Sequence, residues 1–112
     1  VQGRSEEGRA SVIADALAVE AAGAFAVVLE GIPQDLGREI SERLAIPTIG
    51  IGAGVHCDAQ VLVMHDLLGL NDATPTFVKQ YASLGAEASK AARAYIDEVV
   101  NRKFPAEAHV YR

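Results

Sequence analysis

The sequence is short of cysteine, of positive charge and of long apolar runs. Its single cysteine cannot form an internal disulfide, which indicates a reducing, cytoplasmic setting. Its formal net charge of -5 argues against nucleic acid or an anionic membrane as a partner, because both attract clustered lysine and arginine. No apolar run approaches the roughly 18 to 20 residues of a membrane span, and no signal-peptide pattern is present. These features predict a soluble protein.

The 112 residues are enough for one small domain or for a piece of a larger one. Half of the residues are apolar, so a packed core is within reach. The first residue is Val1 instead of methionine, and the opening residues read like the middle of a longer polypeptide. We therefore expect the chain to be a fragment.

Residues 25–33 form an apolar run that contains one carboxylate, Glu30. The β-branched Val27 and Val28 at its centre predict a strand near 24–30, buried on both faces as parallel strands beneath helices are. Because chemistry gathers at the carboxyl ends of parallel strands, Glu30 is the best candidate for a reactive group. The alternative is a solvated glutamate at a loop mouth.

The clearest helix is predicted near 33–44, where Leu36, Ile40 and Leu44 recur at every fourth position. Caps, glycines and apolar periodicity predict the other elements in the same way. The predicted helices lie near 5–22, 33–44, 75–84 and 86–101, and the predicted strands lie near 24–30, 46–52 and 60–65.

Strands that alternate with helices or long crossovers predict a parallel sheet, so the fold class is α/β. Three strands cannot close an eight-stranded barrel, which takes about 250 residues. One face of the sheet would stay uncovered unless a partner or a missing segment covers it. We expect that face to be lined, depending on register, by residues drawn from Val27, Leu29, Ile49, Ile51, Leu62 and Met64.

Two short motifs invite a ligand interpretation. The glycine-rich segment 50–54 departs from the dinucleotide pattern G-x-G-x-x-G, because Val55 stands where its third glycine would be. We expect these glycines to allow a sharp turn and a close backbone approach. His56, Cys57 and Asp58 could each bind a metal, but adjacent residues seldom converge on one ion, so residues 55–58 are predicted to be a loop.

His65 and Asp66 end the third predicted strand, on the same rim of the sheet as Glu30. That position makes His65 a second candidate for chemistry. The alternative is a structural histidine whose ring nitrogens are bonded locally.

Six segments in order resemble the C-terminal half of ketopantoate hydroxymethyltransferase. They are VQGR (1–4), EAAGA (20–24), VLEGIP (28–33), IPTIGIGAG (46–54), VLVMHD (61–66) and the segment 104–109, which begins with Phe-Pro and ends in histidine. Ala59 departs from the family pattern, which has glycine there. The resemblance implies that residues 1–112 are the C-terminal portion of one (β/α)8 TIM barrel and contain its sixth, seventh and eighth strands.

The family is a magnesium-dependent transferase of pantothenate and coenzyme A biosynthesis. It moves a hydroxymethyl group from 5,10-methylenetetrahydrofolate to 3-methyl-2-oxobutanoate, giving 2-dehydropantoate, and usually forms large homo-oligomers. By the resemblance, Glu30 is its general base, and partial desolvation beside Leu29 and Ile32 would strengthen it. The family's magnesium-binding acids lie on earlier strands, so the resemblance assigns this chain no metal ligand and implies that it is catalytically incomplete alone.

Two further readings belong to other functional classes. The chain could be a half-barrel that pairs with itself or with an N-terminal half, as a structural or complementing subunit. It could also be an α/β module without catalysis, whose glycine loops bind a small anion. The resemblance along the whole chain favours the enzyme.

Overall fold

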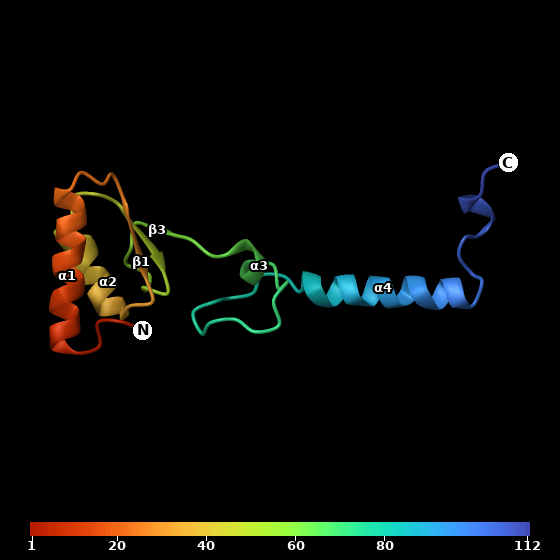
Figure 1. Cartoon of the computed structure of the whole chain (residues 1–112), viewed down its shortest axis with the longest axis horizontal. Coiled ribbons are helices and arrows are strands. Elements are labelled where there is room, and N and C mark those ends of the chain that lie inside the picture. The colour runs from red at the N-terminus through yellow and green to blue at the C-terminus, as the bar shows by residue number, and fades with distance from the viewer. The chain divides into compact units, whose positions relative to one another are not determined.

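The computed structural model describes all residues from Val1 to Arg112 (Figure 1). The chain divides into two compact units, Val1–Leu62 and Val63–Arg112. Each unit has its own secondary structure. None of the helices combines the length and the apolar character needed to cross a membrane.

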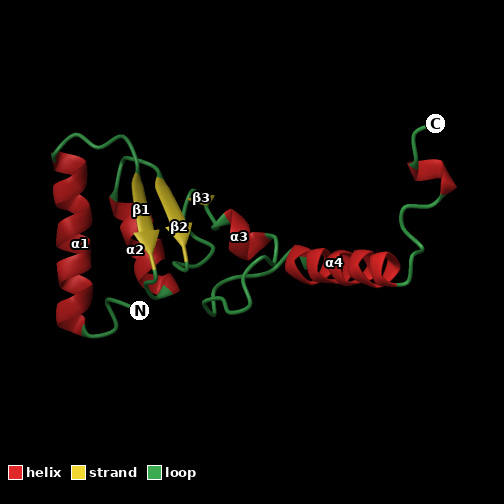
Figure 2. Cartoon of the chain, turned by 45° about the vertical axis from the view of Figure 1, so that its right-hand side comes forward, coloured by secondary structure: helices red, strands yellow, loops and turns green.

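The first unit is a three-stranded parallel sheet with two helices, which confirms the α/β prediction and is consistent with part of a (β/α)8 barrel. The strand order is β1-β2-β3, and both helices lie on one side of the sheet (Figure 2). The elements are α1 (Glu6–Ala21), β1 (Val27–Glu30), α2 (Gln34–Arg43), β2 (Thr48–Ile51) and β3 (Ala59–Gln60).

Helix α1 begins where the sequence predicts, because Ser5 accepts a hydrogen bond from the amide of Gly8 (3.1 Å). Helix α2 also follows its prediction, since Leu36 and Ile40 are fully buried. Arg9 joins the two helices. Its guanidinium forms salt bridges with Asp35 (2.7 Å) and Glu39 (3.1 Å), so α1 is tied to α2 by charge as well as by packing.

The register of β1 and β2 decides which side chains meet the helices. Val27 pairs with Thr48, and Leu29 pairs with Gly50. Leu29 is only 5% exposed, because this face of the sheet packs against α1 and α2. Of the six residues from which the uncovered face was predicted to draw, Val27 and Leu29 therefore lie on the helix side.

The opposite face of the sheet, which we call the open face, carries Val28, Glu30, Ile49 and Ile51 in register. Val28 is 56% exposed, so β1 is not buried on both faces as its apolar sequence predicts. The reason is that both helices of the first unit pack on the other face of the sheet.

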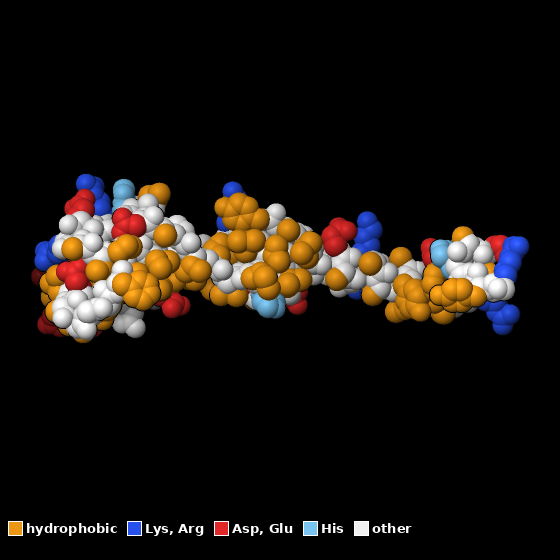
Figure 3. All heavy atoms as spheres, turned by 90° about the horizontal axis from the view of Figure 1, so that it is seen from above, with side chains coloured by type: hydrophobic (Ala, Val, Ile, Leu, Met, Phe, Trp, Pro, Cys, Tyr) orange, Lys and Arg blue, Asp and Glu red, His pale blue; other side chains and the backbone are white.

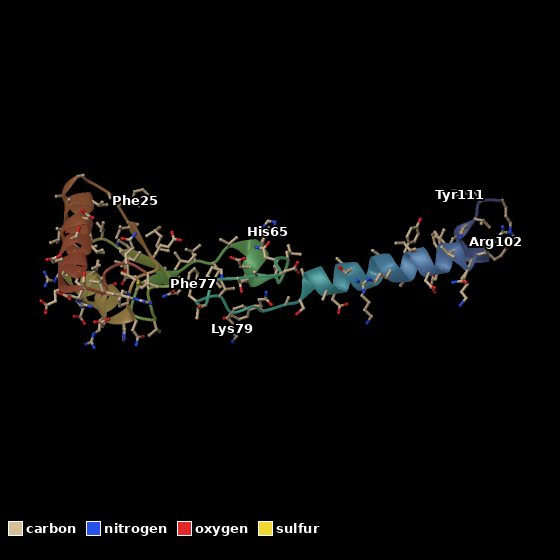
Figure 4. All side chains as sticks on the ribbon, turned by 60° about the horizontal axis from the view of Figure 1, so that its bottom comes forward. Phe25, His65, Phe77, Lys79, Arg102 and Tyr111 are labelled. Carbon is tan, nitrogen blue, oxygen red and sulfur yellow. The ribbon has the colours of Figure 1, made fainter.

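Phe25 belongs to the same apolar run, but it lies before β1, in the connection from α1. Its side chain is 91% exposed and projects away from the ribbon (Figure 4). An exposed aromatic ring beside the sheet adds to the apolar surface that this chain leaves uncovered.

The strand predicted near 60–65 is much shorter than expected. Its last ladder bond runs from the amide of Val61 to the carbonyl of Gly50 (3.0 Å). Strand β2 ends at Ile51, so the residues after Val61 have no neighbour to pair with. The chain leaves the sheet there, and Met64 begins a short helix.

The second unit contains α3 (Met64–Leu67), α4 (Leu84–Val100) and the 3-10 turn η1 (Glu107–His109). The helix predicted near 75–84 is absent. In its place the amide of Val78 closes a turn on the carbonyl of Pro75 (3.0 Å), and the amide of Tyr81 donates to the carbonyl of Leu67 (2.8 Å). A stretch of ten residues with β-branched Thr76 and Val78 is a marginal helix without a packed face.

Apolar side chains of the second unit remain largely exposed, and orange atoms gather over residues 63–84 in Figure 3. Helix α4 forms as predicted, but none of its residues is buried. The apolar stripe along α4 includes Tyr95 (57% exposed) and Val99 (43% exposed), and within its unit Tyr95 packs edge to face against the ring of Phe104, with 5.6 Å between the ring centroids.

Gly37→Ala is expected to destabilise the first unit. A Cβ at this buried position in α2 would lie 2.3 Å from the carbonyl oxygen of Ala53, which is itself fully buried. We expect a loss of about 1 to 3 kcal/mol, as for other overpacked interiors. Chemical denaturation followed by circular dichroism measures it. Gly8→Ala, in α1, is the matched control, because its Cβ would lie 3.1 Å from the Ser5 hydroxyl and 3.3 Å from the Cα of Gly3, contacts that need much smaller shifts than the 2.3 Å contact at Gly37. Equal stability of the two variants would contradict the prediction.

Candidate active site

Glu30 is the last residue of β1 and lies on the open face of the sheet. Its side chain is exposed, and its carboxylate forms no salt bridge. No side-chain hydrogen bond occupies it either, in contrast to Glu20 and Asp58 of the same unit. Both oxygens of Glu30 are therefore free to accept a proton from a ligand.

The surroundings of Glu30 on this face are apolar. Val28 precedes it on the same face, Ile51 is its neighbour in register, and Ile49 lies beside Val28. The expected desolvation by Leu29 and Ile32 does not occur in this chain, because both are buried on the helix side while Glu30 stays exposed. Any further desolvation has to come from whatever covers the open face.

The backbone around Glu30 is held by two other parts of the chain. The amide of Gly31 donates to the carbonyl of Ile51 (2.9 Å), and the carbonyl of Gly31 accepts from the amide of Gln2 (2.9 Å). The end of β1 is thus joined both to β2 and to the first residues of the chain.

The glycine-rich segment 50–54 serves close packing in this structure. A Cβ at Gly54 would lie 2.3 Å from the Cβ of Gln34, at the start of α2. A Cβ at Gly50 would lie 3.0 Å from the sulfur of Cys57. No helix opens after Gly54, so the arrangement differs from a dinucleotide-binding turn, as the sequence indicates.

The loop 55–58 does not gather its three potential metal ligands. Cys57 is buried against Gly50, and His56 is exposed. Asp58 turns to β2, where its carboxylate accepts from the amide (2.8 Å) and the hydroxyl (3.1 Å) of Thr48. The predicted loop therefore has a structural role at the amino-terminal end of β2, away from Glu30.

Asp58 is an electrostatic anchor as well as a hydrogen-bond acceptor. The hydrogen bonds from the amide and then the hydroxyl of Thr48 lower the pKa of the Asp58 carboxyl below its usual value. Thr48 is fully buried, and its hydroxyl also lies 2.7 Å from that of Ser41. A chain of polar groups thus joins α2, β2 and the loop before β3.

His65 and Asp66 do not end a strand, contrary to the sequence prediction. Both lie in α3 of the second unit, because the third strand stops before them. The side chain of His65 is exposed and points away from α3 (Figure 4). Asp66 accepts a hydrogen bond from the side chain of Asn71 (2.6 Å), which is a local structural contact.

No metal centre is formed by the residues of this chain. Nowhere do three or more histidine, cysteine, aspartate or glutamate side chains come together as potential ligands. Glu30 is therefore a candidate reactive group that belongs to no such cluster.

Three features around this site are not evident from sequence patterns. Glu20 accepts hydrogen bonds from the amides of Ala45 (2.6 Å) and Ile46 (3.0 Å), so this carboxylate braces the approach to β2. The other two are Asp58 and the amide of Gln2. A glycine at position 3, two residues before the helix cap, is the signal in the sequence that the first residues take a special path.

Comparison with known proteins gives one consistent family. The family model described as ketopantoate hydroxymethyltransferase matches residues 1–107. A protein of Zymomonas mobilis named 3-methyl-2-oxobutanoate hydroxymethyltransferase 2 is 54% identical over 112 residues, which are 100% of this chain and 41% of that protein. The 3-methyl-2-oxobutanoate hydroxymethyltransferase of Citrifermentans bemidjiense is 57% identical over 113 residues, with 100% of this chain and 42% of that protein covered. This chain thus spans about two fifths of the length of these curated relatives.

Asp58→Asn is expected to lower the free energy of unfolding of the 112-residue chain at neutral pH. At low pH the substitution should leave that free energy unchanged. The folded state lowers the pKa of Asp58, so its contribution is complete above the unfolded value of 3.8 and is lost as the pH falls through the lower folded value. Denaturation midpoints of the parent and the variant, compared from neutral to acid pH, measure the difference.

Asp15→Asn is the matched control, because Asp15 is exposed on α1 and forms no salt bridge. It removes the same charge from the same unit. A gap between the parent and Asp58→Asn that persists below the folded pKa would contradict an electrostatic role for Asp58.

Proposed function

The chain belongs to the ketopantoate hydroxymethyltransferase family, and we propose that it supplies the proton-abstracting part of an enzyme that acts on 3-methyl-2-oxobutanoate. The observation that carries this proposal is the position of Glu30, a free carboxylate at the carboxyl end of a parallel strand. It lies among apolar side chains, on the face of the sheet that the helices of the first unit leave open.

The proposed chemistry starts at the carbon next to the ketone. The carboxylate of Glu30 takes the proton from C3 of the ketoacid, and the electron pair of the broken C–H bond becomes the enolate. Water releases the one-carbon unit of 5,10-methylenetetrahydrofolate as formaldehyde by breaking its two carbon–nitrogen bonds, which leaves tetrahydrofolate. The enolate carbon then bonds to the formaldehyde carbon, and the formaldehyde oxygen takes a proton to become the new hydroxyl group. The product is 2-dehydropantoate.

The structure supports a role for Glu30 as a general base better than a role in holding the backbone. A general base has to reach the substrate proton within hydrogen-bond distance, about 2.6 to 3.2 Å between heavy atoms. Glu30 has no internal partner to give up before it does so, whereas Glu20 and Asp58 are occupied by backbone amides. Of these three carboxylates, only Glu30 is available to a ligand.

The magnesium ion that the family implies does not fit the residues of this chain, which form no cluster of potential ligands. An ion of this kind is usually held by one or two carboxylates together with substrate oxygens and waters. We place its site in the remaining three fifths of a complete enzyme, on strands that would close the barrel over the open face. On this proposal the isolated chain is catalytically incomplete.

Glu30→Gln is expected to abolish deuterium exchange at C3 of 3-methyl-2-oxobutanoate. The test protein is a chimera in which these 112 residues replace the matched segment of the Zymomonas mobilis relative. Nuclear magnetic resonance in deuterium oxide follows the exchange without the folate. We expect a loss of about 100- to 10,000-fold, since glutamine keeps the shape but cannot accept the proton.

Two controls accompany this experiment. Glu6→Gln removes an exposed carboxylate from the first turn of α1 and should leave the exchange rate unchanged. The isolated 112-residue chain should show no exchange above the background rate. If the Glu30→Gln chimera exchanges as fast as its parent, Glu30 is not the base.

A further inference from the structure

We infer that Gln2 is a positioning residue for Glu30. Gly3 makes this possible, because it lets the chain bring Gln2 into place. The backbone amide of Gln2, and not its side chain, makes the contact. The catalytic part of this inference rests on the proposed role of Glu30, whereas the anchoring itself rests on the hydrogen bonds alone.

Two hydrogen bonds hold the peptide groups that follow Glu30. The amide of Gly31 donates to Ile51 at the end of β2 (2.9 Å), and its carbonyl accepts from the amide of Gln2 (2.9 Å). Gly31 has a φ of 61°, a left-handed conformation that extends no strand. The chain therefore turns sharply at this point, and its direction is fixed from both sides.

The side chain of Glu30 has no salt bridge or hydrogen bond of its own within this chain. Its position is consequently set by the backbone to which it is attached. A shift of Gly31 would move the Glu30 carboxylate with it. A misplacement of about 1 Å can cost 100-fold in rate, so the anchoring is relevant to catalysis.

Gly3 fixes the path of Gln2. It is buried, it has a φ of 72°, and a Cβ built on it would lie 2.4 Å from Cδ2 of Leu36. Leu36 is fully buried in the core, so it cannot move aside easily. The first residues lie beside the tip of the β1 arrow in Figure 2, where this close approach brings the amide of Gln2 to Gly31.

Gly3→Ala in the chimera should displace Gln2 and release the carbonyl of Gly31. We expect the C3 exchange rate at saturating ketoacid to fall by about tenfold to 100-fold. The KM for the ketoacid should change much less than the rate, because the amide of Gln2 binds the carbonyl of Gly31 and so acts only on the position of Glu30. The amide of Gly31 should also exchange with deuterium faster than in the parent.

Gly23→Ala is the matched control. Gly23 has a φ of 96°, so alanine is strained there as well, but a Cβ would meet nothing within 4 Å. It lies at the other end of β1, after α1. This variant should lose stability. The deuterium exchange of its Gly31 amide should not change, and neither should the rate and KM of C3 exchange in the ketoacid.

Gln2→Pro provides a second test if Gly3→Ala does not fold. Proline removes the N–H donor without placing a Cβ against Leu36, so it should lower the rate in the same way. The inference is overturned if the amide of Gly31 stays as protected as in the parent, or if Gly23→Ala lowers the C3 exchange rate equally. If the Glu30→Gln chimera exchanges the C3 proton of the ketoacid as fast as its parent, the proposed function is overturned, whatever the exchange rate of the Gly31 amide.

Discussion

The first unit depends on a parallel sheet that its own helices cover on one side only. Leu29, Leu36 and Ile40 form a closed core on that side, with exposures of 5%, 0% and 1%. On the other side, Val28 and Glu30 stand uncovered beside two isoleucines of β2. Burial of apolar surface is the main source of folding free energy, so this face needs a cover of comparable extent. The same asymmetry leaves the candidate base accessible.

Local patterns in the sequence predict most of the first unit. The spacing of Leu36 and Ile40 predicts α2 and its buried face, and the apolar run before Glu30 predicts β1 and places Glu30 at its end. The exposure of β1 could not be predicted, because its composition suits a strand covered on both faces and the sequence does not say what is absent. The third strand and the helix near 75–84 fail for a related reason, since each needs a neighbour that this chain does not provide.

The carboxylates of the first unit differ in what they bind. Glu20 and Asp58 accept hydrogen bonds from backbone amides. Glu20 holds the segment that leads into β2, and Asp58 holds the first residue of β2. Only the structure reveals these structural roles, because hydrogen bonds between distant segments leave no periodic signal in the sequence. The side chain of Glu30 has no hydrogen-bond or salt-bridge partner within the chain. Membership in the family is the reason for proposing that this carboxylate acts as a base. The structural acids and the proposed reactive acid thus differ in their partners and not in their residue type.

Hydroxyl-radical footprinting of side chains tests most directly whether the rest of a complete enzyme covers the open face. The isolated chain, dilute enough to stay monomeric, is compared with the chimera. We expect Val28, Ile49 and Ile51 to be labelled in the isolated chain and protected in the chimera, while Leu36 and Ile40 are protected in both. Equal labelling of the three open-face residues in the two proteins would contradict the account, because that face would then stay wet in the complete enzyme.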